Sequence, residues 1–221
     1  MEVQEVAFLA RFVVESDAIE GIRNDPAEVR RRIEQRSRDD RSIPRGHLGA
    51  ILMLRSAAGP PDDMLVKRVQ RTIVDGQHLK GQRKLRPEEK GEWRMHDVVI
   101  RSSDDITRPP RRIGSRWQDV PADMAAWLAL ACDLHQRCRK QPAHLTIGEI
   151  AHLHWRYERI HPFSDGNGRS GRAMAYYQYL QAGLSPFVFP SRDRGMMYYP
   201  SFEQCTSEMM ERYFLGRGAV R

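Results

Sequence analysis

At positions 161–172 the chain reads His161-Pro162-Phe163-Ser164-Asp165-Gly166-Asn167-Gly168-Arg169-Ser170-Gly171-Arg172. The glycines on both sides of Asn167 permit positive φ angles and leave the backbone N–H groups unobstructed. Directly before a helix, such amides form an anion-binding site that the helix dipole reinforces. Arg169 and Arg172 project from one side of the first helical turn and can bind the oxygens of a polyphosphate. We name residues 161–172 the signature loop.

The two titratable residues of the signature loop suit the transfer of a phosphate-containing group. Asp165 is a hard oxygen ligand that fits a Mg²⁺ ion bridging phosphates. His161 stands at the end of the preceding helix and can accept the proton of a hydroxyl group at neutral pH. That hydroxyl would attack a phosphorus atom stabilised by the metal and the arginines. The chain has no G-x-x-x-x-G-K-S/T sequence, which excludes a P-loop enzyme.

The signature loop resembles the motif of Fic-domain proteins, His-x-Phe-x-Asp/Glu-Gly-Asn-Gly-Arg-x-x-Arg, at all eight defining positions. The resemblance implies that His161 is the general base and that Asp165 binds Mg²⁺. It implies ATP as the co-substrate, with its γ-phosphate at Arg172. The remaining nucleotide contacts in the loop would then come from Gly166, Asn167, Gly168, Arg169 and Gly171. Most members of the family transfer AMP from ATP to a Tyr, Thr or Ser hydroxyl of a protein and release pyrophosphate.

Position 168 bears on which group is transferred. A branch of the family with Lys in place of the second glycine phosphorylates its target, so Gly168 favours nucleotidyl transfer. Transfer of phosphate, UMP or GMP and removal of AMP remain open, because the motif specifies the phosphates more firmly than the base. Two other classes of protein remain as alternatives: a nucleotide-binding regulator with residual activity, and a basic nucleic-acid-binding protein.

A second segment, Ser16-Asp17-Ala18-Ile19-Glu20-Gly21, resembles the inhibitory motif of the family, Ser/Thr-x-x-x-Glu-Gly/Asn. Ser16 and Glu20 are four residues apart and share one face of a helix. The resemblance implies that Glu20 pairs with Arg172 and occupies the place of the γ-phosphate, with Gly21 ending the helix. We therefore expect an autoinhibited protein adenylyltransferase whose activity rises when Glu20 is replaced by glycine.

Two further segments resemble the family. Gly91-Glu92-Trp93-Arg94 followed by Val98-Val99-Ile100 predicts a small β-hairpin. The resemblance makes this hairpin a flap that holds the target peptide by main-chain hydrogen bonds. The residues expected to contact the target are Val98, Val99, Ile100 and Arg101. Tyr199, the second residue of a Tyr-Tyr pair, is expected near the adenine.

The apolar spacing along the rest of the chain predicts helices and no long linker. We expect an all-α fold, a Fic helical bundle with the small β-hairpin flap. Residues 1–23 would form an N-terminal inhibitory helix and residues 24–221 the catalytic domain, within one compact unit. Thr146, with Glu149 three residues later, predicts the N-cap of the helix that ends near Ile160. The expected helices span residues 3–22, 26–35, 47–55, 63–74, 121–139, 146–160, 168–181 and 198–212.

Bulk composition limits the partners. The net charge of +7 is spread along the chain and accompanies no DNA- or RNA-reading motif, so we do not expect a nucleic-acid partner. Three cysteines without zinc spacing indicate reduced thiols, and no apolar run is long enough to span a membrane. We expect a cytoplasmic protein that acts on a target protein. Self-association with automodification remains open.

Overall fold

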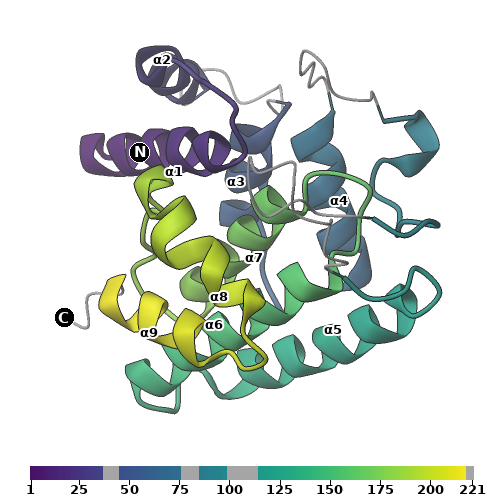
Figure 1. Cartoon of the computed structure of the whole chain (residues 1–221). Helices are drawn as coiled ribbons and strands as arrows, with labels where there is room; N and C mark the ends of the chain where they lie inside the picture. The colour runs from purple at the N-terminus through teal and green to yellow at the C-terminus, as the bar shows by residue number, and fades with distance from the viewer. Residues whose placement is uncertain (37–44, 76–84, 99–113, 218–221) are drawn as a thin grey trace.

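The computed structural model describes residues 1–36, 45–75, 85–98 and 114–217, and within these ranges the regular structure is helical (Figure 1). The helical class predicted from the sequence is confirmed. In chain order the elements are α1 (Val3–Ile19), α2 (Pro26–Arg36), α3 (His47–Ser56), α4 (Asp63–Val74), η1 (Pro87–Glu89), α5 (Val120–Arg137), α6 (Ala143–Ile160), α7 (Asn167–Gln181), η2 (Ser191–Asp193), η3 (Arg194–Tyr198), α8 (Tyr199–Glu203) and α9 (Glu208–Arg217).

Helix α7 is the centre of the fold. Almost all of its residues are buried, and α1, α3, α4 and α6 pack around it (Figure 1). On the far side of α6 lie α5 and α9, and the indole of Trp127 in α5 donates to the Leu153 carbonyl of α6 at 2.8 Å. Helix α2 packs on α1. Because α7 begins inside the signature loop, the surrounding helices hold that loop from several sides.

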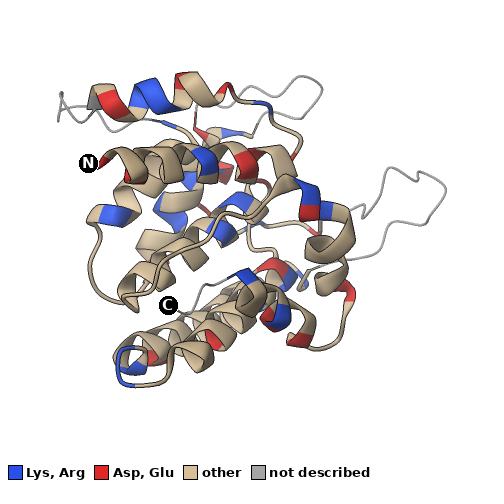
Figure 2. Ribbon diagram, turned by 90° about the vertical axis from the view of Figure 1, so that its left-hand side faces the viewer, with Lys and Arg blue, Asp and Glu red and all other residues tan. Residues whose placement is uncertain are grey.

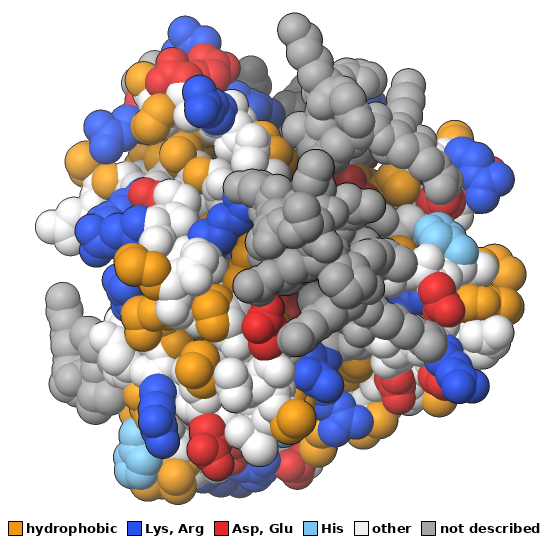
Figure 3. Space-filling model, viewed as in Figure 1, with side chains coloured by type: hydrophobic (Ala, Val, Ile, Leu, Met, Phe, Trp, Pro, Cys, Tyr) orange, Lys and Arg blue, Asp and Glu red, His pale blue; other side chains and the backbone are white. Residues whose placement is uncertain are grey.

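Charged side chains of both signs are interspersed over the molecule (Figures 2 and 3). Among the described residues on the face shown in Figure 3, they alternate with hydrophobic side chains. In the described part of the chain, no helix has the length and apolar character needed to cross a bilayer.

The predicted start of α6 is wrong. The helix begins at Ala143, and Pro142 is its N-cap, with a carbonyl that accepts from the amides of Leu145 (3.1 Å) and Thr146 (3.2 Å). Thr146 lies fully buried inside the helix, and its hydroxyl donates to the Cys138 carbonyl at 3.2 Å. The Glu149 carboxylate binds Arg137 instead of capping the helix. A proline with a preset φ starts the helix one turn earlier than the capping-box pattern indicated.

The helix predicted over residues 198–212 is broken into three pieces. A π-helical turn, η3, leads into the short helix α8, and bends at residues 204–207 separate α8 from α9. Arg159 of α6 donates to the carbonyls of Phe202 (3.1 Å) and Gln204 (3.2 Å), which satisfies backbone acceptors where α8 ends. A side chain from a distant helix therefore stops α8, and no local pattern encodes that stop.

The flap lies partly outside the described residues. Residues 91–98 form turns and irregular backbone, and no strand is assigned to them. Val98 is half-buried. Val99, Ile100 and Arg101 fall outside the described ranges, so the hairpin that they were expected to complete stays a prediction.

Candidate active site

The signature loop joins α6 to α7 through two left-handed backbone positions. His161 caps the C-terminus of α6 with φ 53°, and Gly166 is the N-cap of α7 with φ 79°. The side chain of Asn167 accepts from the Phe163 amide and donates to the Phe163 carbonyl, both at 2.8 Å. The Phe163 ring is fully buried and packs on Trp93, with ring centroids 4.9 Å apart. The loop is thereby fixed around the N-terminus of α7, where free amides favour an anion.

Asp165 lies at the open side of the loop. Its side chain is 39% exposed, one oxygen accepts from the Gly166 amide at 2.6 Å, and the same oxygen lies 3.6 Å from Nη2 of Arg169. The Asp165 carbonyl accepts at 2.9 Å from Gln70, a fully buried residue of α4. The described residues contain no cluster of three or more His, Cys, Asp or Glu side chains suited to a metal. A single accessible carboxylate beside the N-terminus of α7 would suit a Mg²⁺ ion that is bound together with substrate phosphates.

Arg172 is fully buried and binds α1 through two of its three nitrogens. Its Nε donates to the Ser16 hydroxyl at 2.8 Å, and its Nη2 donates to the Ser16 carbonyl at 2.9 Å and to Glu20 Oε1 at 2.7 Å. Its Nη1 donates to the Tyr198 hydroxyl at 3.1 Å. The structure thus brings together Ser16, Glu20 and Arg172, which are more than 150 residues apart in the sequence.

The Glu20 carboxylate sits directly over the start of α7. Burial alone would raise the pKa of Glu20, but the charge and hydrogen bond of Arg172 lower it below the ordinary value. A Cβ atom at Gly168 would collide with Glu20 Oε1 and approach Arg172 Nη1 to 3.0 Å. Glycine at position 168 is therefore needed for Glu20 to reach the arginine, in addition to leaving the loop amides accessible.

His161 is half-buried at the edge of the same site. Burial of its ring lowers the pKa to about 4, and the positive charge of Arg94 acts in the same direction. At neutral pH, well above this value, the imidazole is uncharged, which is the state required of a general base. The negative charge of Glu20 acts on the pKa of His161 in the opposite direction, so the two side chains lie close enough to interact.

Sequence reasoning missed a second carboxyl group at the site. Glu158 lies on the inner face of α6, and its Oε1 packs against the Cα position of Gly171 without a hydrogen-bond partner. Burial raises the pKa of Glu158 to about 8, although the charge of Arg172 opposes the shift. The helical spacing of buried residues in α6 includes position 158, and that spacing was the available signal.

The structure does not test the adenine contact expected at Tyr199. The neighbouring residue, Tyr198, accepts a hydrogen bond from Arg172. Tyr198 is buried and also hydrogen-bonds Nε2 of His154 at 2.8 Å. Tyr199 is half-buried, its hydroxyl donates to the Ile19 carbonyl at 3.4 Å, and Arg194 lies over its ring. Tyr199 therefore contacts the C-terminal end of α1 directly, and Tyr198 contacts the arginine to which that end binds.

A buried polar cluster anchors α1 just before Glu20. Asp17 accepts from Asn24 at 2.5 Å and pairs with Nδ1 of His47, the first residue of α3, at 2.8 Å. Burial alone would raise the pKa of Asp17, but His47 lowers it below the ordinary value. Neither the helical pattern nor the inhibitory motif indicated this cluster, since its partners lie up to 30 residues apart.

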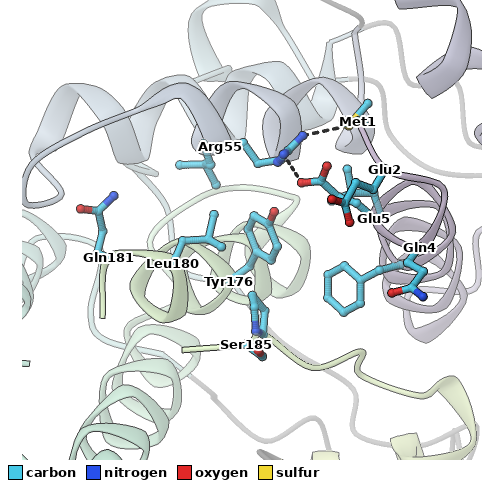
Figure 4. Close-up of a pocket in the computed structure, with 13 residues that line it drawn as sticks. Met1, Glu2, Gln4, Glu5, Arg55, Tyr176, Leu180, Gln181 and Ser185 are labelled. Carbon is cyan, nitrogen blue, oxygen red and sulfur yellow. Dashed lines mark hydrogen bonds and ion pairs between the residues drawn. The ribbon is translucent and has the colours of Figure 1, made fainter. Parts of the chain in front are cut away.

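The opposite end of α1 borders a cavity of about 1140 Å³ between α1, α3 and α7 (Figure 4). Arg55 binds Glu5 there, and Tyr176 and Leu180 of α7 line the wall. This cavity is distant from the signature loop along α1, and it contains none of the residues predicted for the active site.

Comparison with known proteins connects these features to a family. A family model described as "Fic/DOC family" matches residues 65–179. A protein adenylyltransferase Fic of Drosophila erecta is 27% identical over 140 residues, which cover 61% of this chain and 25% of the relative. A protein of the same name from Drosophila persimilis is 34% identical over 53 residues, or 24% of this chain and 10% of the relative. The chain thus matches a quarter or less of the length of these relatives.

Two solved structures share the fold. A Fic-domain-containing signalling protein of Bacteroides thetaiotaomicron superposes with a TM-score of 0.70 at 19% identity, over 96% of this chain and 84% of that one. A fragment of Fic-1 from Caenorhabditis elegans, residues 134–508, superposes with a TM-score of 0.65 at 18% identity, over 99% of this chain and 61% of that one. At these identities the superpositions establish the arrangement of helices.

Proposed function

The chain belongs to the Fic/DOC family, and we propose on that premise that it is an autoinhibited protein adenylyltransferase. It would transfer AMP from ATP to a Tyr, Thr or Ser hydroxyl of a target protein or of itself. The observation that carries the proposal is the convergence of His161, the N-terminus of α7 and Arg172 around the Glu20 carboxylate. The resemblance of the chain to proteins named adenylyltransferases supports the choice of AMP.

The chemistry follows from the roles of these groups. The N-terminal amides of α7, with Arg169, hold the α- and β-phosphates, and Arg172 holds the γ-phosphate. The target hydroxyl loses its proton to His161 as its oxygen bonds to the α-phosphorus. The bond from that phosphorus to the bridging oxygen breaks, and pyrophosphate leaves. Asp165 would hold Mg²⁺, which when bound neutralises phosphate charge.

Glu20 supplies the inhibition. Its carboxylate takes the Arg172 hydrogen bond that the γ-phosphate needs. A phosphate must displace a charged group from a fully buried arginine, and removing one partner of a buried pair costs roughly 3–5 kcal/mol. Residues 1–23 would then be the inhibitory segment and residues 24–221 the catalytic part.

The test is intact-mass analysis of Glu20→Gly protein with ATP and Mg²⁺, beside wild type and the double variant Glu20→Gly/His161→Ala. We expect one added AMP in the single variant, at a rate at least about tenfold above wild type. The roughly 3–5 kcal/mol needed to separate the pair exceeds the about 1.4 kcal/mol that changes an equilibrium tenfold. The double variant should gain nothing. Incubation with UTP or GTP in place of ATP measures base preference.

Other outcomes redirect the assignment. One added phosphate would indicate phosphotransfer despite Gly168. Should no variant modify itself, the same three proteins are incubated with cell lysate and labelled ATP. Equal labelling by the three proteins, with ATP bound tightly by each, would favour a nucleotide-binding regulator and contradict the enzyme.

A further inference from the structure

Arg94 belongs to the segment that the sequence assigned to target binding, yet its side chain is fully buried. The guanidinium lies beneath the C-terminal end of α6, beside the signature loop. A side chain in this position is inaccessible to a target peptide. Its function has to be sought in what it contacts.

Those contacts are the backbone of the residues around His161. The Arg94 amide donates to the Pro162 carbonyl at 2.9 Å, its Nε donates to the His161 carbonyl at 2.7 Å, and its Nη2 donates to the Ile160 carbonyl at 3.3 Å. Three consecutive carbonyls are thus held by one residue. The last carbonyls of a helix lack partners within it and carry the negative end of its dipole, so a cation is well placed there.

Arg94 is itself held in place from other segments. It donates through Nη1 to the His96 carbonyl at 2.8 Å and through Nη2 to the Ser115 carbonyl. Close by, the fully buried Gln70 accepts from the Gly91 amide at 2.6 Å while donating to Asp165. The segment that carries Arg94 is therefore fixed to α4 and to the signature loop before any substrate binds.

The backbone that Arg94 holds is strained. His161 has φ 53° and is the only non-glycine residue with positive φ in the described part of the chain. A left-handed conformation is unfavourable for a residue with a Cβ, and it persists where surrounding contacts impose it. The direction in which the imidazole points depends on this conformation.

We propose that Arg94 is a positioning residue for His161: by binding the carbonyls of residues 160–162 it imposes the left-handed turn that directs the imidazole into the active site. The inference rests on the proposed function, in which His161 is the base. Arg94 also places a positive charge near the imidazole, and this charge helps to keep the base uncharged.

The experiment compares Arg94→Gln and Arg94→Lys in the active Glu20→Gly background. Lysine keeps the charge but cannot hold several carbonyls with a planar fork, whereas glutamine removes the charge as well. Arg86→Gln is the matched control, because Arg86 lies in the preceding segment with its side chain 65% exposed. The measurements are the rate constant of AMP incorporation at saturating ATP, the half-saturating ATP concentration, the pH–rate profile, and crystal structures of the variants.

We expect both Arg94 variants to lower the rate constant roughly 10- to 100-fold, because small displacements of a catalytic group cost that much. The half-saturating ATP concentration should stay within about twofold, since Arg172 and the loop amides are untouched. Arg94→Gln should also move the acidic limb of the profile to higher pH, because loss of the charge raises the pKa of His161. Arg94→Lys should leave that limb in place, and Arg86→Gln should change nothing.

Two results would overturn the inference. One is an unchanged rate constant in Arg94→Lys protein that binds ATP normally, a result that decides the matter even should Arg94→Gln fail to fold. The other is a variant structure in which His161 keeps its left-handed φ. A Glu20→Gly parent without activity would instead contradict the proposed function, and the variant structures would still test the role of Arg94.

Discussion

The two ends of α1 use the same pair of residue types in opposite surroundings. At the N-terminal end Glu5 pairs with Arg55, with side chains 36% and 28% exposed, beside the open cavity of Figure 4. At the C-terminal end Glu20, whose side chain is 28% exposed, pairs with Arg172, whose side chain is fully buried. Ion pairs between exposed groups contribute about 0–1 kcal/mol, whereas removing one partner of a buried charge such as that of Arg172 costs up to roughly 3–5 kcal/mol. We infer that, of the two ion pairs, the one at the C-terminal end contributes more to holding α1 on α7, in addition to the apolar face that α1 buries along its length.

The two ion pairs also differ in whether they occupy groups that a nucleotide would need. Each contact made by Arg172 with α1 occupies a donor that a phosphate could use. The contact of Arg55 with Glu5 occupies nothing in the active site. If the proposed function holds, loosening the N-terminal end of α1 should leave catalysis unchanged, whereas loosening its C-terminal end should relieve the inhibition by Glu20.

The largest effect should come from Asp17→Leu, which removes the partner of His47 and Asn24 beside Glu20. We expect the free energy of unfolding to fall by about 3–5 kcal/mol, because a buried polar pair loses one member. AMP incorporation should rise above wild type as the C-terminal end of α1 loosens. Urea denaturation and intact-mass rates measure the two effects.

Asp17→Leu/His47→Leu is the control for this prediction. Replacing both members of a buried pair with apolar residues is often neutral, so the double variant should recover part of the lost stability. An Asp17→Leu protein whose free energy of unfolding lies within about 1 kcal/mol of wild type would contradict this prediction. The contacts of Asp17 would then stabilise α1 no more than the exposed pair of Glu5 with Arg55 does.

The sequence predicted the parts of this comparison that depend on local pattern. Helical spacing placed α1 and α3 within a few residues of their observed ends, and the resemblance paired Glu20 with Arg172, which the structure also pairs. The contacts of Ser16 with Arg172 were not predicted. Contacts between distant segments escaped prediction. The pairing of Asp17 with His47 and the termination of α8 by Arg159 depend on tertiary packing, which no spacing along the chain records.

Arg94 shows the same limit within a motif. The motif identified the segment but not its position beside the signature loop, where Arg94 binds the carbonyls of His161 and Pro162 in the loop and of the adjacent Ile160. The assignment to target binding came from the resemblance of the whole segment. The direction of one side chain, which decides between target and base, is fixed only by the helix end against which it packs.

A smaller effect on stability should follow from Glu158→Gln. This variant tests how the Arg172 hydrogen bond distinguishes Glu20, at the C-terminal end of α1, from Glu158. Glu20 and Glu158 both face Arg172, but Glu20 receives its hydrogen bond and has a lowered pKa, while burial raises the pKa of Glu158 to about 8. The folded protein therefore holds a proton that the unfolded chain releases above its ordinary pKa of 4.5. The stability that this proton contributes is fully present below pH 4.5 and is lost as pH rises toward 8.

Thermal and urea denaturation from pH 5 to pH 8 measure this linkage. Relative to the glutamine variant, wild type should lose stability on the order of 3 kcal/mol across the range, at about 1.4 kcal/mol for each pKa unit. The difference between the two proteins isolates Glu158, because the lowered pKa values of His154 and His161 act on the stability of both alike. Parallel pH dependences in the two proteins would contradict a protonated Glu158.

The smallest effect should come from Glu5→Gln at the N-terminal end of α1. Solvent screens the pair with Arg55, so the free energy of unfolding should change by less than about 1 kcal/mol. AMP incorporation should stay within about twofold of wild type, because the Arg172 contacts remain. Raising the salt concentration should weaken whatever the pair contributes, since exposed charges are screened within about 10 Å at 0.1 M salt. A strong rise in AMP incorporation on Glu5→Gln would mean that the whole of α1, rather than its C-terminal end alone, is responsible for the inhibition.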